Sequence, residues 1–366
     1  MTYIDKYFRS KADKLAYLEL KNEKEKYIDF GLNDIALPII SDDLMKALQN
    51  NKFDNEVDSA YIVEGMLYNI GVDPEFKYSK DYINVLKNMI DQPTKYAIAK
   101  AVSYLDDSME KSLVFFRAAT IIDSKDDFAA YNLARLLWRL DVDKDAKESF
   151  IASSIDILED ILQRNSDYSL AYYELANIFR ALGEYIKAMN YYRRALELVD
   201  EESVREEIRN NMKDIEADAL IEDAIHYISK MNYPKALDLL LQVQKNSNRY
   251  DALYYIAVSY MNMEDFENSL YYFDKALKGG ADFATLYIDY IYVLYSSGQI
   301  FEALNLANEA LEKYPADLKI RYNRALIYVE LSKKDKALED LDFILEYADL
   351  SDEFRGQILE IRNNLI

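Results

Sequence analysis

The feature that most constrains the fold is a motif that recurs along most of the chain. A small residue is followed four places later by a bulkier residue and seven places later by another small one. The motif occurs at Ser112-Phe116-Ala119, Ala146-Phe150-Ser153, Ala188-Tyr192-Ala195, Ser269-Phe273-Ala276 and, with alanine also in the middle place, Ala303-Ala307-Ala310, and in weaker form at Ala236-Leu240-Val243 and Ala337-Leu341-Ile344. Its first residues are separated by 34, 42, 48, 33, 34 and 34 positions. A period of this length predicts a stack of structural repeats.

A second register, twelve residues upstream of the first, completes each repeat. It holds Ala134, Ala176, Ala224, Ala257 and Ala325, followed three places later by Leu137, Phe179, Tyr227, Tyr260 and Tyr328. Spacings of three, four and seven place side chains on one helical face, so each period predicts two helices joined by a turn. The turns are expected at Leu182-Gly183, Met231-Asn232, Met263-Glu264, Ser297-Gly298 and Ser332-Lys333. Small residues at the contact points let helix backbones approach closely.

The composition fits an all-helical repeat array. Glycine (8) and proline (5) are scarce, and 51% of the residues are apolar. Each repeat of an array packs only on its neighbours, so a chain of 366 residues needs no single large core. Tyrosine pairs recur at Tyr172-Tyr173, Tyr191-Tyr192, Tyr254-Tyr255 and Tyr271-Tyr272. Neighbouring side chains are turned by about 100° on a helix, so one ring of each pair is expected to be exposed.

Four segments resemble tetratricopeptide repeats across both helices: residues 171–198 (AYYELANIFRALGEYIKAMNYYRRALEL), 252–277, 285–315 with its terminal Pro315, and 321–345. The resemblance covers residues 93–351 well and 58–92 faintly. It departs at Lys100 and Ile291, where a small residue is usual, and over 217–249, which is apolar where alanine is usual. The resemblance implies an all-α fold, a right-handed α-solenoid of about seven or eight stacked helix-turn-helix repeats with a helical cap at each end.

The repeat spacing also predicts the organisation of the chain. We expect an N-terminal helical cap or separate small bundle at 1–57, a front array at 58–200, a helical insertion at 201–216, a back array at 217–351 and a C-terminal capping helix at 352–366. The spacing of 48 residues predicts either an overlong helix near 201–217 or a change in the direction of the superhelix. The spacing of 42 residues predicts that the second helix near 141–160 is lengthened.

The two ends of the chain carry helical patterns of their own. Ile4, Tyr7, Phe8, Leu15 and Leu18 predict a first amphipathic helix that ends in the charged run Lys21 to Lys26. Ser41 is a suitable N-cap for a short helix to about Gln49. At the other end, Phe354, Ile358, Ile361 and Leu365 form one apolar stripe after Ser351, which is typical of a helix that covers the last repeat.

The formal charge of −22, from 66 acidic and 44 basic residues, limits the classes of partner. Such a field repels phosphate backbones, so we expect no nucleic acid partner and a preference for neutral or basic protein segments. The N-terminus lacks the apolar core of a signal peptide, and no run of about 18 apolar residues occurs. These observations favour a cytoplasmic protein without a membrane insertion.

Candidate chemical groups are few. Asp141, Asp143 and Asp145 are spaced like the start of a calcium loop, but Ala146 and Ala152 replace the glycine and glutamate that such a loop needs. His226 is the single histidine, there is no cysteine, and no nucleophile or phosphate-binding motif accompanies it. We therefore expect no metal, no cofactor and no catalytic residue, with His226 at or near the surface.

The resemblance implies that the first helix of each repeat lines a concave binding surface. Carried onto this sequence, the ligand-binding residues are Tyr131, Asn132, Arg135, Tyr173, Glu174, Asn177, Tyr254, Tyr255, Asp289, Tyr292, Tyr322 and Asn323. Chaperone-binding members of the family hold a C-terminal carboxylate with lysine, asparagine and arginine. Corresponding sites here carry Tyr173, Glu174, Tyr254 and Asp289, which disfavours such a ligand. A neutral-to-basic segment with aromatic residues is the expected ligand.

Three functions remain as alternatives. The first is a non-catalytic scaffold or adaptor that binds a peptide segment or a partner helix. The second is a peptide-sensing regulatory protein, in which residues 1–57 form a helical bundle in front of the repeats. The third is an enzyme regulated by repeats, for which no segment large enough to form a catalytic domain is left over. The sequence favours the scaffold, and it does not specify the partner, the process or the oligomeric state.

Overall fold

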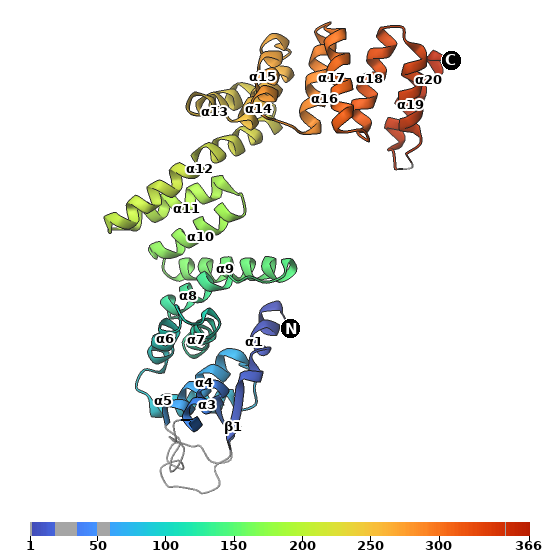
Figure 1. Cartoon of the computed structure of the whole chain (residues 1–366). Coiled ribbons are helices and arrows are strands. Elements are labelled where there is room, and N and C mark those ends of the chain that lie inside the picture. The colour runs from blue at the N-terminus through green and yellow to red at the C-terminus, as the bar shows by residue number, and fades with distance from the viewer. Residues whose placement is uncertain (1, 19–34, 50–58, 348) are drawn as a thin grey trace. The chain divides into compact units, whose positions relative to one another are not determined.

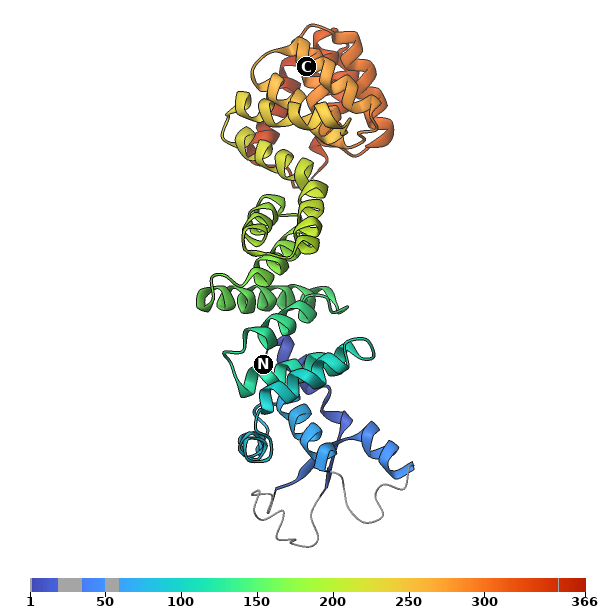
Figure 2. The same ribbon diagram turned by 90° about the vertical axis from the view of Figure 1, so that its left-hand side faces the viewer.

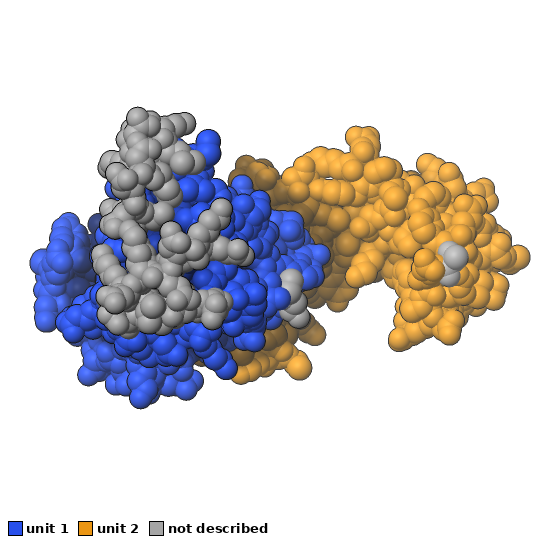
Figure 3. All heavy atoms as spheres, turned by 90° about the horizontal axis from the view of Figure 1, so that it is seen from below, with its two compact units in different colours: residues 1–212 blue, residues 213–366 orange. Residues whose placement is uncertain are grey.

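The computed structural model describes residues 2–18, 35–49, 59–347 and 349–366 and shows helices throughout except for one small sheet (Figure 1). The predicted charged run Lys21 to Lys26 lies outside these residues. The chain divides into two compact units, Met1–Met212 and Lys213–Ile366, which Figure 3 colours separately. Each unit is described by itself.

Unit 1 contains the N-terminal elements and the first helix pairs. The N-terminal elements are α1 (Tyr3–Arg9), a short 3-10 helix (Ala12–Lys14), β1 (Leu15–Leu18), β2 (Leu37–Ile40), α3 (Ser41–Gln49), α4 (Ser59–Val72) and α5 (Ser79–Met89). The helix pairs are α6 (Pro93–Ser103) with α7 (Met109–Ile122), α8 (Asp127–Leu137) with α9 (Lys144–Arg164), and α10 (Ser169–Ala181) with α11 (Tyr185–Leu198).

The helix α12 (Glu202–Ser229) runs through the boundary between the units. Unit 2 continues with α13 (Tyr233–Asn246), and then with the pairs α14 (Tyr250–Asn262) and α15 (Phe266–Lys278), α16 (Ala284–Ser296) and α17 (Ile300–Lys313), and α18 (Leu318–Glu330) and α19 (Lys334–Leu345). The last element is α20 (Asp352–Leu365). The predicted all-α repeat fold is confirmed.

The small residues of both registers lie at the contacts between helices. Ala176, Ala188, Ala257 and Ala303 have no exposed surface, and the same is true of Ser112, Ala134, Ala224, Ala236, Ser269, Ala325 and Ala337. Phe116, Tyr192 and Phe273, the bulky residues of their motifs, are also fully buried. The motif therefore marks the positions where one helix packs on the next, as the sequence predicts.

The five predicted turns share one backbone geometry. Each contains a residue with positive φ, which is Gly183 (78°), Met231 (57°), Glu264 (60°), Gly298 (78°) or Ser332 (55°). The residue after it donates its backbone N–H to the carbonyl of the residue five places earlier, as in Glu184 to Phe179 (2.9 Å) and Lys333 to Tyr328 (2.8 Å). This bond is the mark of a Schellman motif, which satisfies the last carbonyls of the helix.

The two insertions lengthen helices. α9 has 21 residues and α12 has 28, whereas α10 has 13 and α14 has 13. Of the two alternatives for 201–217, the overlong helix is therefore observed. At the C-terminus, the Ser351 side chain caps α20, and Ile358 of the predicted stripe is fully buried beside Leu341 and Ile344 of α19.

The N-terminal prediction of one helix from Ile4 to Leu18 is wrong. The helix α1 ends at Arg9, and Leu15–Leu18 forms a strand that pairs antiparallel with Leu37–Ile40. The two strands are far apart along the chain, so local periodicity does not reveal their pairing. Figure 2 shows the two strands beside α4. The strand β2 is buried along its length, because α4 packs against it at Gly65.

An N-terminal strap, residues 3–14, ties the start of the chain to the repeats of unit 1. Ion pairs join Asp5 to Arg117 (3.0 Å) and Arg9 to Asp73 (3.0 Å), and both Lys11 and Lys14 pair with Glu110. The buried Phe8 and Leu15 belong to the same hydrophobic core as α4, α7 and α8. Within the described residues, the N-terminal elements are therefore part of unit 1.

Candidate functional site

The predicted binding residues of α8 are largely engaged in packing. Tyr131 is 7% exposed, and Asn132 is 5% exposed and donates to the Phe128 carbonyl (2.9 Å). Burial raises the pKa of Tyr131 to about 12. Arg135 is exposed. Arg135 is therefore the member of this group that an incoming ligand can reach most easily.

Glu174 of α10 is a buried carboxylate held by two residues that directly follow α8. It is 1% exposed, accepts a hydrogen bond from Trp138 Nε1 (2.6 Å) and pairs with Arg139 (2.6 Å). The Arg139 guanidinium lies 4.7 Å from the centre of the Trp138 ring. These two bonds link α10 to the residues that follow α8. Removing either partner would leave a buried charge uncompensated, so the role of Glu174 is primarily structural.

The other predicted residues of unit 1 are bonded to neighbouring helices, Tyr173 to α12 and Asn177 to α11. Tyr173 bonds with Glu207 and Asn211, and Arg180 donates to Asn211 (3.0 Å). Asn177 accepts a hydrogen bond from the Tyr192 hydroxyl (2.6 Å). The partners of Tyr173 and Arg180 lie more than 30 residues away along the chain, which is why the sequence does not indicate them.

In unit 2, Tyr254 and Asp289 form a hydrogen-bonded link between α14 and α16. The Tyr254 hydroxyl donates to Asp289 Oδ2 (2.8 Å), and its ring meets Phe283 edge-on with 5.0 Å between the ring centres. Burial raises the pKa of both the Tyr254 phenol and the Asp289 carboxyl above their ordinary values. The pair is thus built into the fold, and Tyr255 lies beside it with its ring 5.1 Å from that of Tyr254.

The tyrosine pairs only partly follow the expectation of one exposed ring each. Tyr271 is 53% exposed beside a half-buried Tyr272. Tyr192 is fully buried and Tyr191 half-buried, while both rings of 172–173 and of 254–255 are half-buried. The expectation is wrong for these pairs because rings on neighbouring helices cover one another, as Tyr191 does with Phe179 at 5.4 Å.

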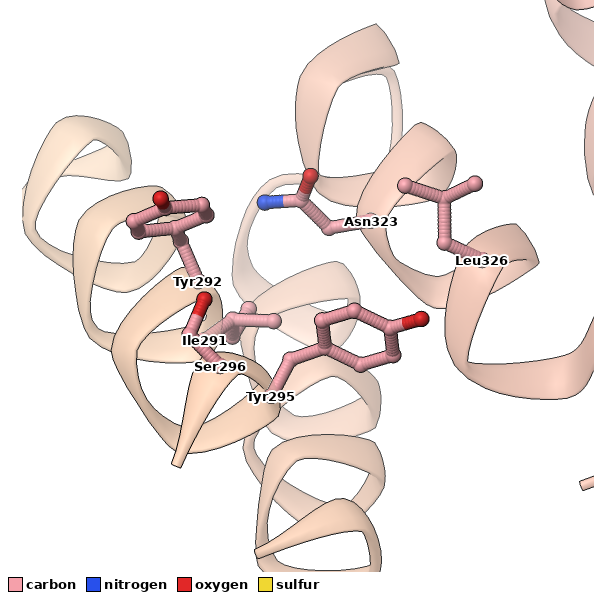
Figure 4. Close-up of a pocket in the computed structure, with 6 residues that line it drawn as sticks. All are labelled: Ile291, Tyr292, Tyr295, Ser296, Asn323 and Leu326. Carbon is pink, nitrogen blue, oxygen red and sulfur yellow. The ribbon is translucent and has the colours of Figure 1, made fainter. Parts of the chain in front are cut away.

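A hollow opens between α16 and α18. Its lining residues are Ile291, Tyr292, Tyr295, Ser296, Asn323 and Leu326, and its volume is about 120 Å³. Figure 4 shows Tyr292 and Tyr295 projecting from α16 on one side, with Asn323 and Leu326 on α18 across from them. Tyr292 is 51% exposed. The sequence predicts Tyr292 and Asn323 as binding residues, and the structure brings them to the same hollow.

Three neighbouring first helices of unit 2 carry apolar side chains at intervals of four and three. These are Tyr254, Val258 and Met261 on α14, Ile288, Tyr292 and Tyr295 on α16, and Tyr322, Leu326 and Val329 on α18. Every one of them is half-buried or exposed, and α16 is packed against both α14 and α18. We refer to this surface as the first-helix face of unit 2. Spacing alone would have found Tyr295 and Leu326, since they share the helical faces of Tyr292 and Tyr322.

The equivalent positions in unit 1 differ in chemistry. They hold Tyr131, Arg135 and Trp138 along α8 and directly after it, and Tyr173, Asn177 and Arg180 on α10. Arginine and amide groups thus interrupt the stripe, and part of it is occupied by α12. The first-helix face of unit 2 is the more apolar of the two and contains the hollow.

One of the three aspartates considered as metal ligands has a structural role. Asp143 caps α9 by accepting from the backbone N–H of Ala146 (3.0 Å). Among the residues that the structure describes, no group of three or more acidic, histidine or cysteine side chains could hold a metal. His226 is exposed on α12, as expected. In the same part of the chain, no helix is both long and apolar enough to cross a bilayer.

Stacked helix pairs with an accessible apolar face define an α-helical repeat scaffold of the kind that mediates contacts between proteins. The family follows from the sequence models for tetratricopeptide repeats, which match residues 169–201 in unit 1 and 291–346 in unit 2. Both units therefore contain tetratricopeptide repeats. Such repeats are generally non-catalytic modules that bind peptides or proteins.

Solved structures of similar repeats were also found. YrrB, described as a tetratricopeptide repeat protein with an unusual peptide-binding site, is 22% identical with a TM-score of 0.37, covering 52% of this chain and 91% of its own. A tetratricopeptide repeat protein from Parabacteroides merdae is 17% identical with a TM-score of 0.35, covering 74% and 98%. Yeast Tom70 is 14% identical with a TM-score of 0.38, covering 86% and 66%. A comparison with curated proteins gave no match.

Proposed function

We propose that this protein is a non-catalytic interaction scaffold and that it binds a neutral-to-basic protein segment on the first-helix face of unit 2. The observation that carries the proposal is the hollow between α16 and α18, set among three adjacent apolar stripes. Accessible apolar side chains that gather on one face are typical of a contact surface. Of the twelve residues that the sequence predicts, Tyr292 and Asn323 are those that line the hollow.

The size of the hollow supports recognition of a single apolar side chain. An apolar cavity of about 150 Å³ accommodates a benzene molecule. The hollow here has about 120 Å³ and is open to the outside, with Ile291 as its fully buried wall. One leucine or aromatic side chain of a partner therefore fits it. Burying such a side chain contributes about 1.5–3 kcal/mol to binding before the costs of association.

The charge of the protein supports a basic partner. The net charge is −22, and Asp289 and the exposed Glu330 belong to the helices of this face. A field of this sign attracts basic segments and repels nucleic acid. We therefore extend the proposal to a protein partner with lysine or arginine beside its apolar residues.

A comparison of three variants tests the proposal. Tyr292→Gln and Leu326→Gln remove apolar surface from the hollow, and Tyr271→Gln is the matched control, because Tyr271 is a tyrosine of nearly equal exposure (53% against 51%) on the second helix α15. A partner captured by the wild-type chain and identified by mass spectrometry should bind Tyr271→Gln normally and both other variants at least about tenfold more weakly. Equal binding to all three variants would exclude this face.

A further inference from the structure

We infer that Asp289 is the residue on the first-helix face of unit 2 that binds a basic side chain of the partner, and that its carboxylate takes a lysine ammonium or an arginine guanidinium. The inference rests on the proposed function, because it assigns the basic part of the ligand to one residue of the same face. The observation that carries it is a carboxylate that the fold partly buries without pairing it with a cation.

The most buried carboxylates of this protein show how the fold usually accommodates a negative charge. Among the described residues, three carboxylate side chains are at most 9% exposed. Each of them forms an ion pair with a lysine or arginine of its own unit: Glu64 with Lys100, Glu174 with Arg139, and Asp340 with Arg321 and Arg324. A charge that leaves water is tolerated when it is paired and hydrogen-bonded.

Asp289 on α16 departs from this pattern. Its side chain is half-buried, and its Oδ2 accepts a hydrogen bond from the Tyr254 hydroxyl (2.8 Å). No lysine or arginine of the described residues forms an ion pair with it. Lys319, which is exposed on α18, acts on it only through space. Within the part of the chain that the structure describes, the hydrogen-bond partner of this carboxylate is therefore a neutral hydroxyl.

The titration of Asp289 reflects the missing cation. Burial raises the pKa of its carboxyl group, and the hydrogen bond from Tyr254 and the charge of Lys319 offset this only in part. Glu110 and Asp251 are desolvated too, but the basic side chains beside them bring their pKa values below the ordinary range. A basic side chain from a partner would supply the same stabilisation to the charged form of Asp289.

The carboxylate keeps one oxygen for such a ligand, close to the hollow. Asp289 Oδ1 accepts no hydrogen bond within the described residues and remains accessible to solvent. Asp289 precedes Tyr292 by three residues, or about 4.5 Å along the helix axis. Asn323 of the hollow donates to the carbonyl of Ile288, the residue before Asp289 (3.3 Å). A partner can therefore place a basic side chain at Asp289 and a nearby apolar side chain in the hollow.

Thermal melting of the ligand-free chain gives the first test. Asp289→Asn keeps an oxygen for the Tyr254 hydroxyl and removes an unpaired charge, so its melting temperature should equal or exceed that of the wild-type chain. Asp340→Asn is the contrast, because it leaves Arg321 and Arg324 beside a neutral amide, and its melting temperature should fall by at least about 2 °C. A comparable fall for Asp289→Asn would show that its charge serves the fold, and would overturn the inference.

Two synthetic peptides test the cation directly with the full chain. Both have blocked ends and a glycine and serine sequence that carries one leucine and, two residues away, either lysine or acetyllysine. Acetylation removes the charge of the lysine. Titrations followed by the NMR signals of the peptide, at an ionic strength of about 0.15 M, measure each dissociation constant. The wild-type chain should bind the lysine peptide at least about tenfold more tightly than the acetyllysine peptide.

Variants assign this preference to one residue. It should disappear in Asp289→Asn and persist in Glu330→Gln, the matched control, because Glu330 is an exposed carboxylate on α18 whose loss changes the net charge equally. Equal binding of the two peptides to the wild-type chain, binding of neither peptide, or a preference that persists in Asp289→Asn would each overturn the inference.

Two results separate a failure of the inference from a failure of the proposed function. If Tyr292→Gln weakens binding of both peptides and Asp289→Asn changes neither, the face is correct and the assignment of Asp289 is wrong. If Asp289→Asn abolishes the preference while Tyr292→Gln and Leu326→Gln bind like the wild-type chain, Asp289 binds the cation and the hollow is not the apolar site. Far-ultraviolet circular dichroism of each variant shows whether the fold is retained.

Discussion

Single small residues set how closely the helices of this protein pack. Ala188 of α11 has no exposed surface, so a larger side chain there must push a neighbouring helix away. We expect Ala188→Leu to lower the free energy of unfolding by about 1–3 kcal/mol. Ala152→Leu is the control, because Ala152 is exposed on α9 of the same unit and should change stability by less than about 0.5 kcal/mol. Urea denaturation followed by circular dichroism measures both, and equal losses would show that position 188 tolerates bulk.

The backbone of the helix turns gives a prediction with opposite signs at two positions. Gly298 has a φ of 78°, and no atom lies within 4 Å of the position that a Cβ would take. The cost of Gly298→Ala therefore comes from the left-handed backbone conformation and not from a steric clash. We expect a loss of about 1–2 kcal/mol. Glu264 has a φ of 60°, and Glu264→Gly should gain a few tenths of a kcal/mol, since relief of strain is partly offset by chain entropy. Melting temperatures check both signs.

At the scale of elements, the approach of β2 to α4 depends on one missing side chain. A Cβ at Gly65 would lie 1.9 Å from the backbone oxygen of Pro38. Gly65→Ala must therefore displace the strand or the helix, and we expect a loss of about 1–3 kcal/mol. Gly356→Ala provides the contrast, because no atom lies within 4 Å in α20 and alanine favours a helix by about 0.5–1 kcal/mol. The midpoint of urea denaturation should fall for Gly65→Ala and rise for Gly356→Ala, relative to the wild-type chain.

The carboxyl groups that hold the N-terminal strap make the stability of unit 1 depend on pH. Hydrogen bonding from Thr2, together with Arg117, lowers the pKa of Asp5. Burial alone would raise the pKa of Glu110, but Lys14 and Lys11 lower it below its ordinary value. A lowered pKa in the folded state stabilises the fold above the ordinary pKa of the carboxyl group, and this contribution is lost as the pH falls through the folded value.

The matching variant is Glu110→Gln, which removes the ionisable partner of Lys11 and Lys14. Its melting temperature should lie below that of the wild-type chain at pH 7, and the difference should shrink as the pH falls below about 4.5. A difference that stays constant from pH 7 to pH 3 would show that the charge of Glu110 does not stabilise the strap.

The elements also show which parts of the fold a sequence can predict. Helices, turns and caps depend on residues three to seven places apart, and the motif of small and bulky residues therefore located them correctly. The pairing of β1 with β2, and the coverage of Tyr173 by Glu207 and Asn211 of α12, join residues that are far apart along the chain. No local pattern records such contacts. The same reason explains why the sequence pointed to Tyr292 and Asn323 but not to a hollow that requires α16 and α18 together.

For the whole molecule, the hydrophobic clusters predict how unfolding proceeds. The cluster that contains Phe8, Tyr68 and Phe150 lies within unit 1, and those that contain Ala236, Ala303 and Ala325 lie within unit 2. Repeats that contact only their neighbours need not unfold together. We expect more than one calorimetric transition, and Ala303→Leu should shift one of them alone. A single transition that moves as a whole would show that the units unfold as one.

The helix turns have a consequence for how such chains diverge. Their closure relies on main-chain atoms, with N–H to carbonyl bonds that any residue can form, and three of them tolerate methionine, glutamate or serine where others have glycine. A side chain at these positions strains the backbone, but it does not prevent the turn from closing. The repeat closed by Met231 and the one closed by Glu264 keep the architecture although no family model reaches them. A repeat can thus keep the backbone torsion angles of the fold where its sequence does not match the family model.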